Sequence, residues 1–357
     1  MAEVGVGLIG CGSIAGHHAR AWAEVEGARL VRCADVNGEV ARKFAEEHGI
    51  RRWSANWQDV ISDPEVSIVV ICTPTNYHAE QALAALEAGK HVLCEKPIAL
   101  TLEDASKMVD TARERGLKLG VGFQRRFHDE WRALREIIRG GRIGRPIVWR
   151  MAAATAGPTR PWFLDMDKGA GPFVDLAVHF YDLARALLGE PRAVVADLLK
   201  LKREFGDAPD TGVVSVEFEG GDRLIMTLSW GLPGLGHQAC QGASMFDLLG
   251  PRGAILRSQK GWRITRPDGE EEVPFEPTPW PELFKRQAQK FLKAVVEGGE
   301  PEATGEDGLR ALEVGLAAIE SARTGRRIKL PLRPGGIDKQ DARSKAPARN
   351  EVLPGEG

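Results

Sequence analysis

Hydrophobic positions in the first 122 residues form short continuous runs that alternate with longer amphipathic stretches. The clearest run is Val66–Cys72, which is nearly all apolar and rich in β-branched residues, as expected of a parallel strand covered on both faces. Further strands are predicted at 6–9, 29–34, 91–94 and 118–122, with helices at 17–24, 39–48, 59–62, 79–88 and 102–115. This β-α alternation predicts an α/β domain with a doubly wound parallel sheet.

The pattern changes after about residue 125. Strand-like runs now follow one another across short turns, at 147–154, 193–200, 212–218, 223–230, 244–249, 253–257 and 261–266. Helices are predicted at 127–139, 173–188, 281–297 and 306–323. Consecutive strands with short turns form antiparallel sheets. The sequence therefore predicts a first domain over 1–125, a second over 126–333, and a flexible or arm-like tail over 334–357.

Composition and charge narrow the class of protein. The 357 residues are 43% hydrophobic and 27% charged, with a formal net charge of −2. This near neutrality favours neither nucleic acid nor an anionic membrane as a partner, and no run approaches the roughly 18 apolar residues of a membrane span. The five cysteines include no Cys-x-x-Cys pair, and no basic region precedes the first strand. We therefore expect a cytoplasmic protein with free thiols.

A glycine-rich turn follows the first predicted strand. Residues 10–15 (GCGSIA) match the pattern G-x-G-x-x-(G/A), which places the pyrophosphate of a dinucleotide between a strand and a helix. Gly10 permits the tight turn, Gly12 permits close approach of the phosphates, and the following helix directs its amides toward them. The predicted cofactor contacts in this turn are Gly10, Gly12, Ser13 and Ile14. A glycine turn without a ligand is the alternative.

Asp35 ends the second predicted strand. A carboxylate there accepts hydrogen bonds from the adenosine ribose and repels a 2′-phosphate. No arginine occurs in the next three residues, so NAD is favoured over NADP. Capping of the next helix is the alternative role for Asp35. The loop 73–78, after the central strand, should also face the cofactor, because ligands bind at the carboxyl ends of strands in open α/β sheets.

Several polar and aromatic residues are candidates for the chemistry. Lys96 follows a strand at the predicted cofactor edge, where it can orient a substrate hydroxyl or simply be a surface lysine. Asp175 and His179 are four apart on a predicted apolar helix, either as a buried polar pair or as a general base with its orienting carboxylate. Trp162, in a proline-rich loop, can stack on a sugar or plug the loop onto the core. Histidine and cysteine spacings indicate no metal site.

The order of these motifs resembles one family. Residues 10–15 (GCGSIA) are followed by 72–78 (CTPTNYH), 94–97 (CEKP), 122–127 (GFQRRF) and the pair Asp175-x-x-x-His179. Over residues 4 to about 332 the chain is similar to the glucose-fructose oxidoreductase/inositol dehydrogenase/rhizopine-catabolism (Gfo/Idh/MocA) family. The resemblance implies a Rossmann domain followed by an α+β domain with a large, mostly antiparallel open sheet. That sheet commonly forms the oligomer interface, which implies a homodimer or homotetramer.

The resemblance also implies roles for individual residues. Lys96 and His179 act in catalysis, with Asp175 beside them. Cofactor contacts are implied for Thr73, Pro74, Asn76, His78, Glu95, Lys96 and Gln124, and substrate contacts for Lys96, Arg126, Trp162, Asp165, Asp175 and His179. Many inositol dehydrogenases carry Asp after the histidine, where this chain has Phe180. This departure favours a sugar or another cyclitol over myo-inositol itself as the substrate.

Together these features predict an NAD(P)-dependent oxidoreductase that acts on CH–OH donors. More specifically, we expect an NAD-dependent dehydrogenase that oxidises a secondary alcohol of a sugar, sugar derivative or inositol. His179 removes the proton, Lys96 assists, and Asp175 orients His179. An NAD-dependent glycosidase of the same family, which uses transient oxidation, is the alternative. A non-catalytic sugar or NAD sensor is disfavoured, because it would be expected to lose Lys96 or His179.

Overall fold

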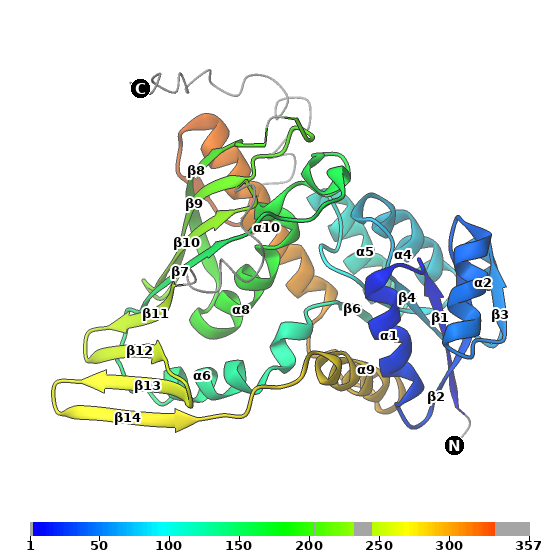
Figure 1. Ribbon diagram of the computed structural model, residues 1–357, viewed down its shortest axis with the longest axis horizontal. Coiled ribbons are helices and arrows are strands. Elements are labelled where there is room, and N and C mark those ends of the chain that lie inside the picture. The colour runs from blue at the N-terminus through cyan, green and yellow to red at the C-terminus, as the bar shows by residue number, and fades with distance from the viewer. Residues whose placement is uncertain (1–2, 203, 232–244, 333–357) are drawn as a thin grey trace.

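The computed structural model describes residues 3–202, 204–231 and 245–332. A parallel sheet lies in the first 121 residues, and a larger sheet is built from strands between residues 148 and 329 (Figure 1). The predicted tail over 334–357 and Cys240 lie outside the described residues. Within the described part, no helix has both the length and the apolar character needed to cross a membrane.

The first sheet has six parallel strands in the order β3-β2-β1-β4-β5-β6. They are β1 (Val4–Ile9), β2 (Ala28–Ala34), β3 (Arg52–Ser54), β4 (Ile68–Ile71), β5 (His91–Cys94) and β6 (Leu119–Val121). The hydrophobic runs identified all of them except β3, whose three residues are not buried and form no apolar run. Strand order reverses between β1 and β4, and a doubly wound sheet binds its ligand beyond the carboxyl ends of such strands.

Helices cover both faces of this sheet. They are α1 (Ser13–Ala23), α2 (Gly38–Glu47), α3 (Gln58–Ile61), α4 (His78–Glu87) and α5 (Leu102–Glu114). Strand residues such as Leu8 and Val70 belong to the core with α1 and α2. Their sequence neighbours Ile9 and Val69 belong to the core with α3, α4 and α5. Because both faces are buried, the strands have continuous rather than alternating apolar residues.

The second sheet has nine strands in the order β14-β13-β12-β11-β7-β10-β9-β8-β15. They are β7 (Val148–Ala154), β8 (Pro191–Leu199), β9 (Thr211–Phe218), β10 (Arg223–Ser229), β11 (Met245–Gly250), β12 (Gly253–Arg257), β13 (Gly261–Arg266), β14 (Gly269–Pro274) and β15 (Ile328–Lys329). Only β7 and β10 run parallel; the other neighbours are antiparallel, which confirms the predicted mostly antiparallel sheet. The hydrophobic pattern did not predict β14, which is acidic, or β15, which has two residues.

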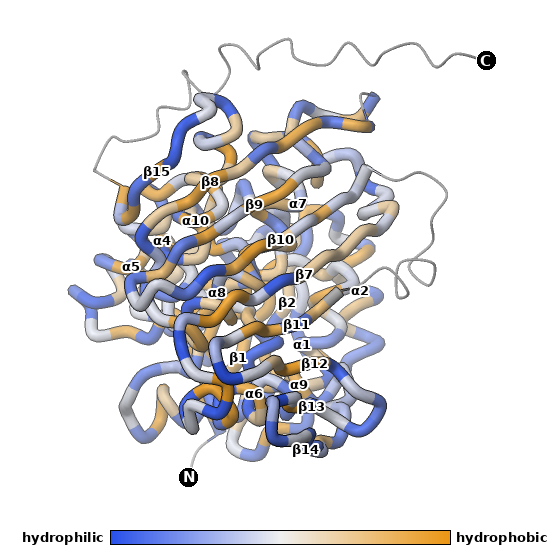
Figure 2. The backbone as a smooth tube through the Cα atoms, turned by 90° about the vertical axis from the view of Figure 1, so that its left-hand side faces the viewer, coloured by the Kyte–Doolittle hydropathy of each residue, from blue (hydrophilic) through white to orange (hydrophobic). Residues whose placement is uncertain are grey.

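One face of the second sheet is covered and the other is open. Helices α6 (Asp129–Arg139), α8 (Val178–Leu188) and α10 (Gly305–Thr324) lie on the side toward the first sheet (Figure 1). Figure 2 views the open face, on which Val195, Val213 and Ile225 are 49%, 43% and 36% exposed. Such exposed apolar side chains on adjacent strands are compatible with an oligomer interface, which stays a prediction.

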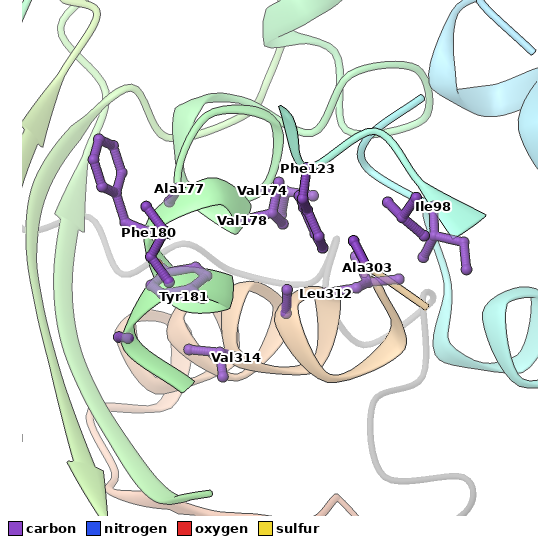
Figure 3. Close-up of a cluster of buried hydrophobic side chains, with 14 of the residues drawn as sticks. Ile98, Phe123, Val174, Ala177, Val178, Phe180, Tyr181, Ala303, Leu312 and Val314 are labelled. Carbon is purple, nitrogen blue, oxygen red and sulfur yellow. The ribbon is translucent and has the colours of Figure 1, made fainter. Parts of the chain in front are cut away.

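A shared core fills the space between the two sheets. Figure 3 shows Phe123, which follows β6, beside Val174 and Val178, with Leu312 of α10 below them. The helix predicted over 173–188 is two segments here, α7 (Pro172–Asp175) and α8. The backbone leaves the α-helix at residues 176–177 between them.

The last two helices pack on the first domain. Helix α9 (Trp280–Glu297) contacts α1, and α10 contacts α5. A Cβ at Gly120 of β6 would lie 2.8 Å from the ring of Phe291, so the glycine lets α9 approach the sheet closely. The packed unit around the first sheet therefore includes helices that the chain order assigned to the domain over 126–333.

Candidate active site

The glycine turn after β1 has the backbone that a dinucleotide site needs. Gly10 has φ of +87°, and a Cβ there would lie 2.8 Å from the carbonyl carbon of Cys72. Gly12 caps α1 and has nothing within 4 Å of a Cβ position. No side chain caps this helix, so the first amides, from Ser13 and Ile14 on, are left for a ligand. The turn therefore fits the pyrophosphate of NAD.

Asp35 lies beside this turn and not at a helix cap. Its Oδ2 accepts a hydrogen bond from the backbone N–H of Cys11 at 3.0 Å, and its Oδ1 accepts one from Asn37 at 3.0 Å. Asn37 itself caps α2 by accepting from two backbone amides. The capping alternative for Asp35 is therefore excluded. A carboxylate has about four acceptor positions, so Asp35 can hold the turn and still accept from ribose hydroxyls.

His78 joins the loops that follow β4 and β5. Its Nδ1 lies 2.7 Å from the carbonyl oxygen of Pro97, and its Nε2 lies 2.8 Å from that of Thr73. The side chain is 1% exposed; burial lowers its pKa, and the contacts with the two carbonyl oxygens oppose that change. With both nitrogens engaged, His78 supports the loops and has no free polar atom for the cofactor. Thr73 and Pro74 are half-buried and Asn76 is exposed, so they stay candidates for that contact.

Glu95 is a second buried support. Its Oε1 lies 2.7 Å from Nε2 of His18, and its Oε2 accepts from the backbone N–H of Lys96 at 3.2 Å. A Cβ at Gly122 would lie 2.7 Å from Oε1, so the absence of a side chain there makes room for the carboxylate. Because His18 belongs to α1, this contact fixes the helix of the glycine turn to the strand end that carries Lys96. Glu95 thus acts on the cofactor site through its neighbours.

Lys96 connects the first domain to α7. Its Nζ donates to the backbone carbonyl of Asp175 at 2.9 Å and to the carboxylate Oδ1 at 3.2 Å. Burial raises the pKa of Asp175, and the charge of Lys96 offsets part of that rise. The pair therefore fixes the ammonium group at the contact between the two domains.

The hydrogen bond expected between Asp175 and His179 is not formed. Among the described residues, no hydrogen bond reaches either ring nitrogen of His179, and Nδ1 is buried without a partner. The helix break at residues 176–177 is the reason, because it removes the continuous helix on which residues four apart share a face. The expectation that Asp175 orients His179 is corrected accordingly: its carboxylate is paired with Lys96.

The surroundings of His179 keep its imidazole neutral. The side chain is 4% exposed and packs edge-on against Phe123, with the ring centroids 5.9 Å apart. Burial lowers the pKa of His179 well below its usual value, and the charges of Arg125 and Lys96 lower it further. A neutral imidazole accepts a proton, so His179 is in the protonation state of a general base at neutral pH.

Gln124 has an unused hydrogen-bond acceptor. It follows Phe123 in the chain, is 3% exposed, and its Oε1 is enclosed without a partner. Leaving a buried amide oxygen unpaired costs about 1–3 kcal/mol. The carboxamide N–H of a nicotinamide would satisfy it, so Gln124 fits the cofactor contact that the resemblance implied.

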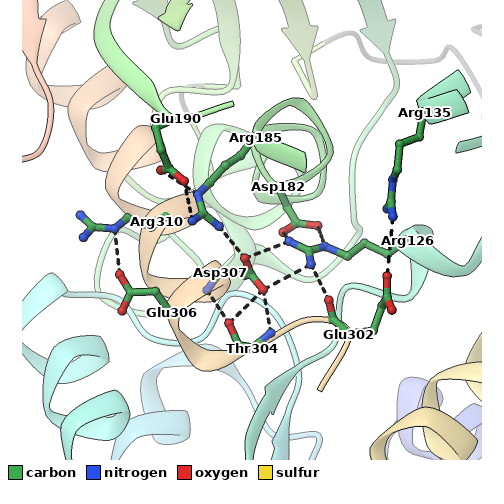
Figure 4. A network of polar contacts seen from close by, with 10 residues as sticks. All are labelled: Arg126, Arg135, Asp182, Arg185, Glu190, Glu302, Thr304, Glu306, Asp307 and Arg310. Carbon is green, nitrogen blue, oxygen red and sulfur yellow. Dashed lines mark hydrogen bonds and ion pairs between the residues drawn. The ribbon is translucent and has the colours of Figure 1, made fainter. Parts of the chain in front are cut away.

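Arg126 is engaged inside the protein and is not available for the substrate contact expected of it. Its guanidinium donates to both carboxylate oxygens of Asp182, at 2.7 and 2.5 Å (Figure 4). It also donates to the carbonyl of Glu302 at 2.5 Å and to Asp307 at 3.2 Å. Asp307 also forms an ion pair with Arg185, whose Nη1 lies 2.5 Å from its Oδ1. This network joins the segment after β6 to α8 and α10.

The loop before α7 carries the other two candidate substrate residues. Trp162 stacks on Phe163 with ring centroids 3.8 Å apart. Asp165 forms an ion pair with Lys168 at 2.8 Å, and its backbone carbonyl accepts from the N–H of Ala170, just before α7, at 2.9 Å. Both candidates therefore lie near the contact between the domains, but the structure shows Trp162 in a stack and Asp165 in an ion pair.

The sequence pattern did not indicate that three further residues belong to this site: His18, Gly122 and Arg125. His18 gave no signal, because its partner Glu95 is 77 positions away. Gly122 opens the motif GFQRRF, which marked the segment without showing that the glycine makes room for Glu95. Arg125 and Arg126 are adjacent, and only tertiary contacts distinguish them. Among the residues that the structure describes, no group of three or more His, Cys, Asp or Glu is arranged to hold a metal ion.

Two family models match the chain. Residues 4–123 match the model described as "Oxidoreductase family, NAD-binding Rossmann fold". Residues 135–330 match the model of the same family's "C-terminal alpha/beta domain". Together the two matches cover both sheets of the structure.

Named relatives match most of the chain. The 1,5-anhydro-D-fructose reductase of Ensifer adhaerens is 34% identical over 79% of this chain and 85% of its own length. The myo-inositol 2-dehydrogenase of Thermotoga maritima is 30% identical over 91% of this chain and 98% of its own. A levoglucosan dehydrogenase solved with NADH and levoglucosan has a TM-score of 0.78 and 28% identity, and covers 92% of this chain and 100% of its own.

Proposed function

The chain belongs to the Gfo/Idh/MocA oxidoreductase family, and we propose that it is an NAD-dependent dehydrogenase that oxidises a secondary alcohol of a sugar, sugar derivative or cyclitol. NAD is the cofactor of this oxidoreductase. The names of its relatives, among them inositol and levoglucosan dehydrogenases, support the substrate class. One observation carries the proposal: Lys96, fixed by Asp175, and a neutral, unpartnered His179 lie where the two domains meet.

In the proposed reaction, His179 takes the proton of the substrate hydroxyl. The ammonium group of Lys96 donates a hydrogen bond to the same oxygen and stabilises the negative charge that develops as the proton leaves. Asp175 acts through Lys96, because its carboxylate and its carbonyl fix the position of Nζ. When bound, NAD supplies the hydride acceptor for the carbon that carries the hydroxyl.

The cofactor is held by residues of the first domain. The amides at the start of α1 bind the pyrophosphate, and Asp35 accepts from the adenosine ribose. Gln124 accepts from the nicotinamide carboxamide, which satisfies the amide oxygen that lacks a partner. We also propose a cytoplasmic homodimer or homotetramer that associates through the open face of the second sheet.

Replacing His179 by alanine tests the proposal. We expect His179→Ala to lower kcat by about 10²- to 10⁴-fold, the usual contribution of a general base, while NAD binding is retained. His91→Asn is the matched control. His91 lies at the amino end of β5, whereas Lys96 follows the carboxyl end of the same strand. NADH absorbance is followed with inositols, aldoses, sugar acids and glycosides, and NAD binding by calorimetry. Unchanged turnover in His179→Ala would refute the role of the histidine.

The same screen separates the dehydrogenase from a glycosidase of the family. Net formation of NADH from a free polyol supports the proposal. Release of an aglycone from a glycoside without net NADH contradicts it, because transient oxidation regenerates the cofactor.

A further inference from the structure

Arg125 is a cationic residue to which the structure gives no anionic partner. It lies in the short 3₁₀ segment η2 (Gln124–Phe127), directly before Arg126. Among the described residues no hydrogen bond or ion pair reaches its guanidinium, and its Nε is enclosed without a partner. The contact that holds it is the ring of Phe180, whose centroid lies 4.9 Å from the guanidinium carbon.

Within the part of the chain that the structure describes, no acid pairs with this charge. Glu130 is the acid whose charge reaches Arg125, but its Oε2 lies 2.8 Å from Arg257. Burial lowers the pKa of Arg125, yet a guanidinium remains protonated at neutral pH. Stacking on an aromatic ring compensates only part of the lost hydration, because it leaves the N–H edge of the guanidinium unpaired. Arg125 is thus a positioned cation without an anion among residues 3–202, 204–231 and 245–332.

The cation lies next to the proposed general base. Phe180 directly follows His179 in α8, Phe123 packs edge-on against the imidazole two residues before Arg125, and the charge of Arg125 lowers the pKa of His179. Lys96 already has the carboxylate of Asp175 as its counter-charge. Of the two cations around His179, Arg125 is therefore the one that is free to pair with an anionic ligand.

We propose that Arg125 binds the carboxylate of the substrate, which makes a sugar acid the compound that this enzyme oxidises. The inference rests on the proposed function, since it places the carboxylate on the molecule whose hydroxyl His179 deprotonates. A carboxylate matches the charge and the bidentate geometry of one guanidinium. A phosphate dianion would bring a second negative charge, and Lys96, which is paired with Asp175, is not free to neutralise it.

The test compares substrates that differ only in the acidic group. The NAD-loaded enzyme is assayed with D-glucuronate, its neutral methyl ester and D-glucose, and with the corresponding galactose series. We expect kcat/KM to be higher for a uronate than for its ester and its aldose. In Arg125→Met, kcat/KM for the uronate should fall roughly 10- to 100-fold, mainly through KM, since this is the usual contribution of hydrogen bonds to a charged group. Arg125→Lys should restore part of the loss.

Arg132→Met is the matched control, because Arg132 is on α6 with an exposed side chain (68%) and pairs with Asp129 on the same helix. Neutral sugars should be oxidised equally well by wild type and control, and Arg125→Met should lower kcat/KM far more for the uronate than for the neutral sugars. Equal use of ester and uronate, a better rate with glucose 6-phosphate, or no use of any uronate would each overturn the inference. His179-dependent oxidation of neutral sugars alone would overturn it and leave the proposed function intact, whereas no His179-dependent oxidation would refute both.

Discussion

Two clusters of buried polar groups lie one turn apart on α8, and they are built differently. In the first, around Asp182, every charge has a partner (Figure 4). In the second, around His179, three groups have no partner in the described part of the chain: the imidazole Nδ1, the amide oxygen of Gln124 and the guanidinium of Arg125. Unpaired buried polar groups destabilise the folded protein, and these three are available to a ligand beside the proposed general base.

Arg125 and Arg126 show the same difference between adjacent residues. Arg126 bridges the segment after β6, α8 and α10 through two carboxylates. Arg125 contacts an aromatic ring and no acid. The two clusters therefore separate stability from function: the paired cluster holds the domains together, and the unpaired cluster is available to cofactor and substrate.

The largest expected effect comes from breaking the paired cluster. Arg126→Met leaves Asp182 buried without its cation, which should lower the free energy of unfolding by about 3–5 kcal/mol. Arg125→Met removes an unpaired charge and should leave that free energy nearly unchanged or slightly higher. Urea denaturation of both variants measures the difference. If Arg125→Met were as destabilising as Arg126→Met, the distinction between the clusters would fail.

A smaller effect should follow from filling the space beside Glu95. In Gly122→Ala the new Cβ would lie 2.7 Å from Oε1 of Glu95 and displace it from His18, so stability should fall by about 1–3 kcal/mol. NAD affinity should fall as well, because the contact fixes α1. Gly38→Ala is the control for stability, since its Cβ would make only ordinary contacts, at 3.5 Å or more. Equal unfolding free energies for the two variants would contradict the role of Gly122.

Removing the charge of Asp35 should change the choice of cofactor. Asp35→Asn keeps one acceptor for the turn but loses the carboxylate, so NAD affinity should fall about tenfold and discrimination against NADP should relax. Calorimetric titration with both cofactors checks this. An unchanged ratio of the two affinities would show that the carboxylate does not act on the ribose.

The smallest expected effect is on the pH profile. Because burial and two cations lower the pKa of His179, the acid limb of kcat/KM should lie below pH 6.5. Arg125→Met removes one of those cations and should move this limb to higher pH.

The same shift predicts how stability depends on pH. His179 in the unfolded chain binds a proton near pH 6.5, whereas in the folded protein it does so only at lower pH, so the free energy of unfolding should fall as the pH decreases below 6.5. An acid limb above pH 7 in the wild type would contradict this protonation state.

Much of the fold could be predicted because the first-domain strands and helices carry strong local patterns. The run at 66–72 is β4, and the acidic β14 was missed because it has no such pattern. Residues 173–188 were predicted to form one continuous helix, because apolar residues surround Asp175 and His179 on both sides of the break between α7 and α8. Propensity and periodicity do not show a break that packing between two sheets imposes.

The sequence by itself determined the glycine turn, the acid at Asp35, and the presence of Lys96 and His179, because each depends on residue type and local spacing. Tertiary structure alone decided the partners. Asp175 is paired with Lys96 and not with His179. Arg126 contacts two carboxylates, whereas Arg125 contacts the aromatic ring of Phe180. The physical reason is that neighbours in space come from segments far apart in the chain, so whether a charge has a partner depends on the folded structure.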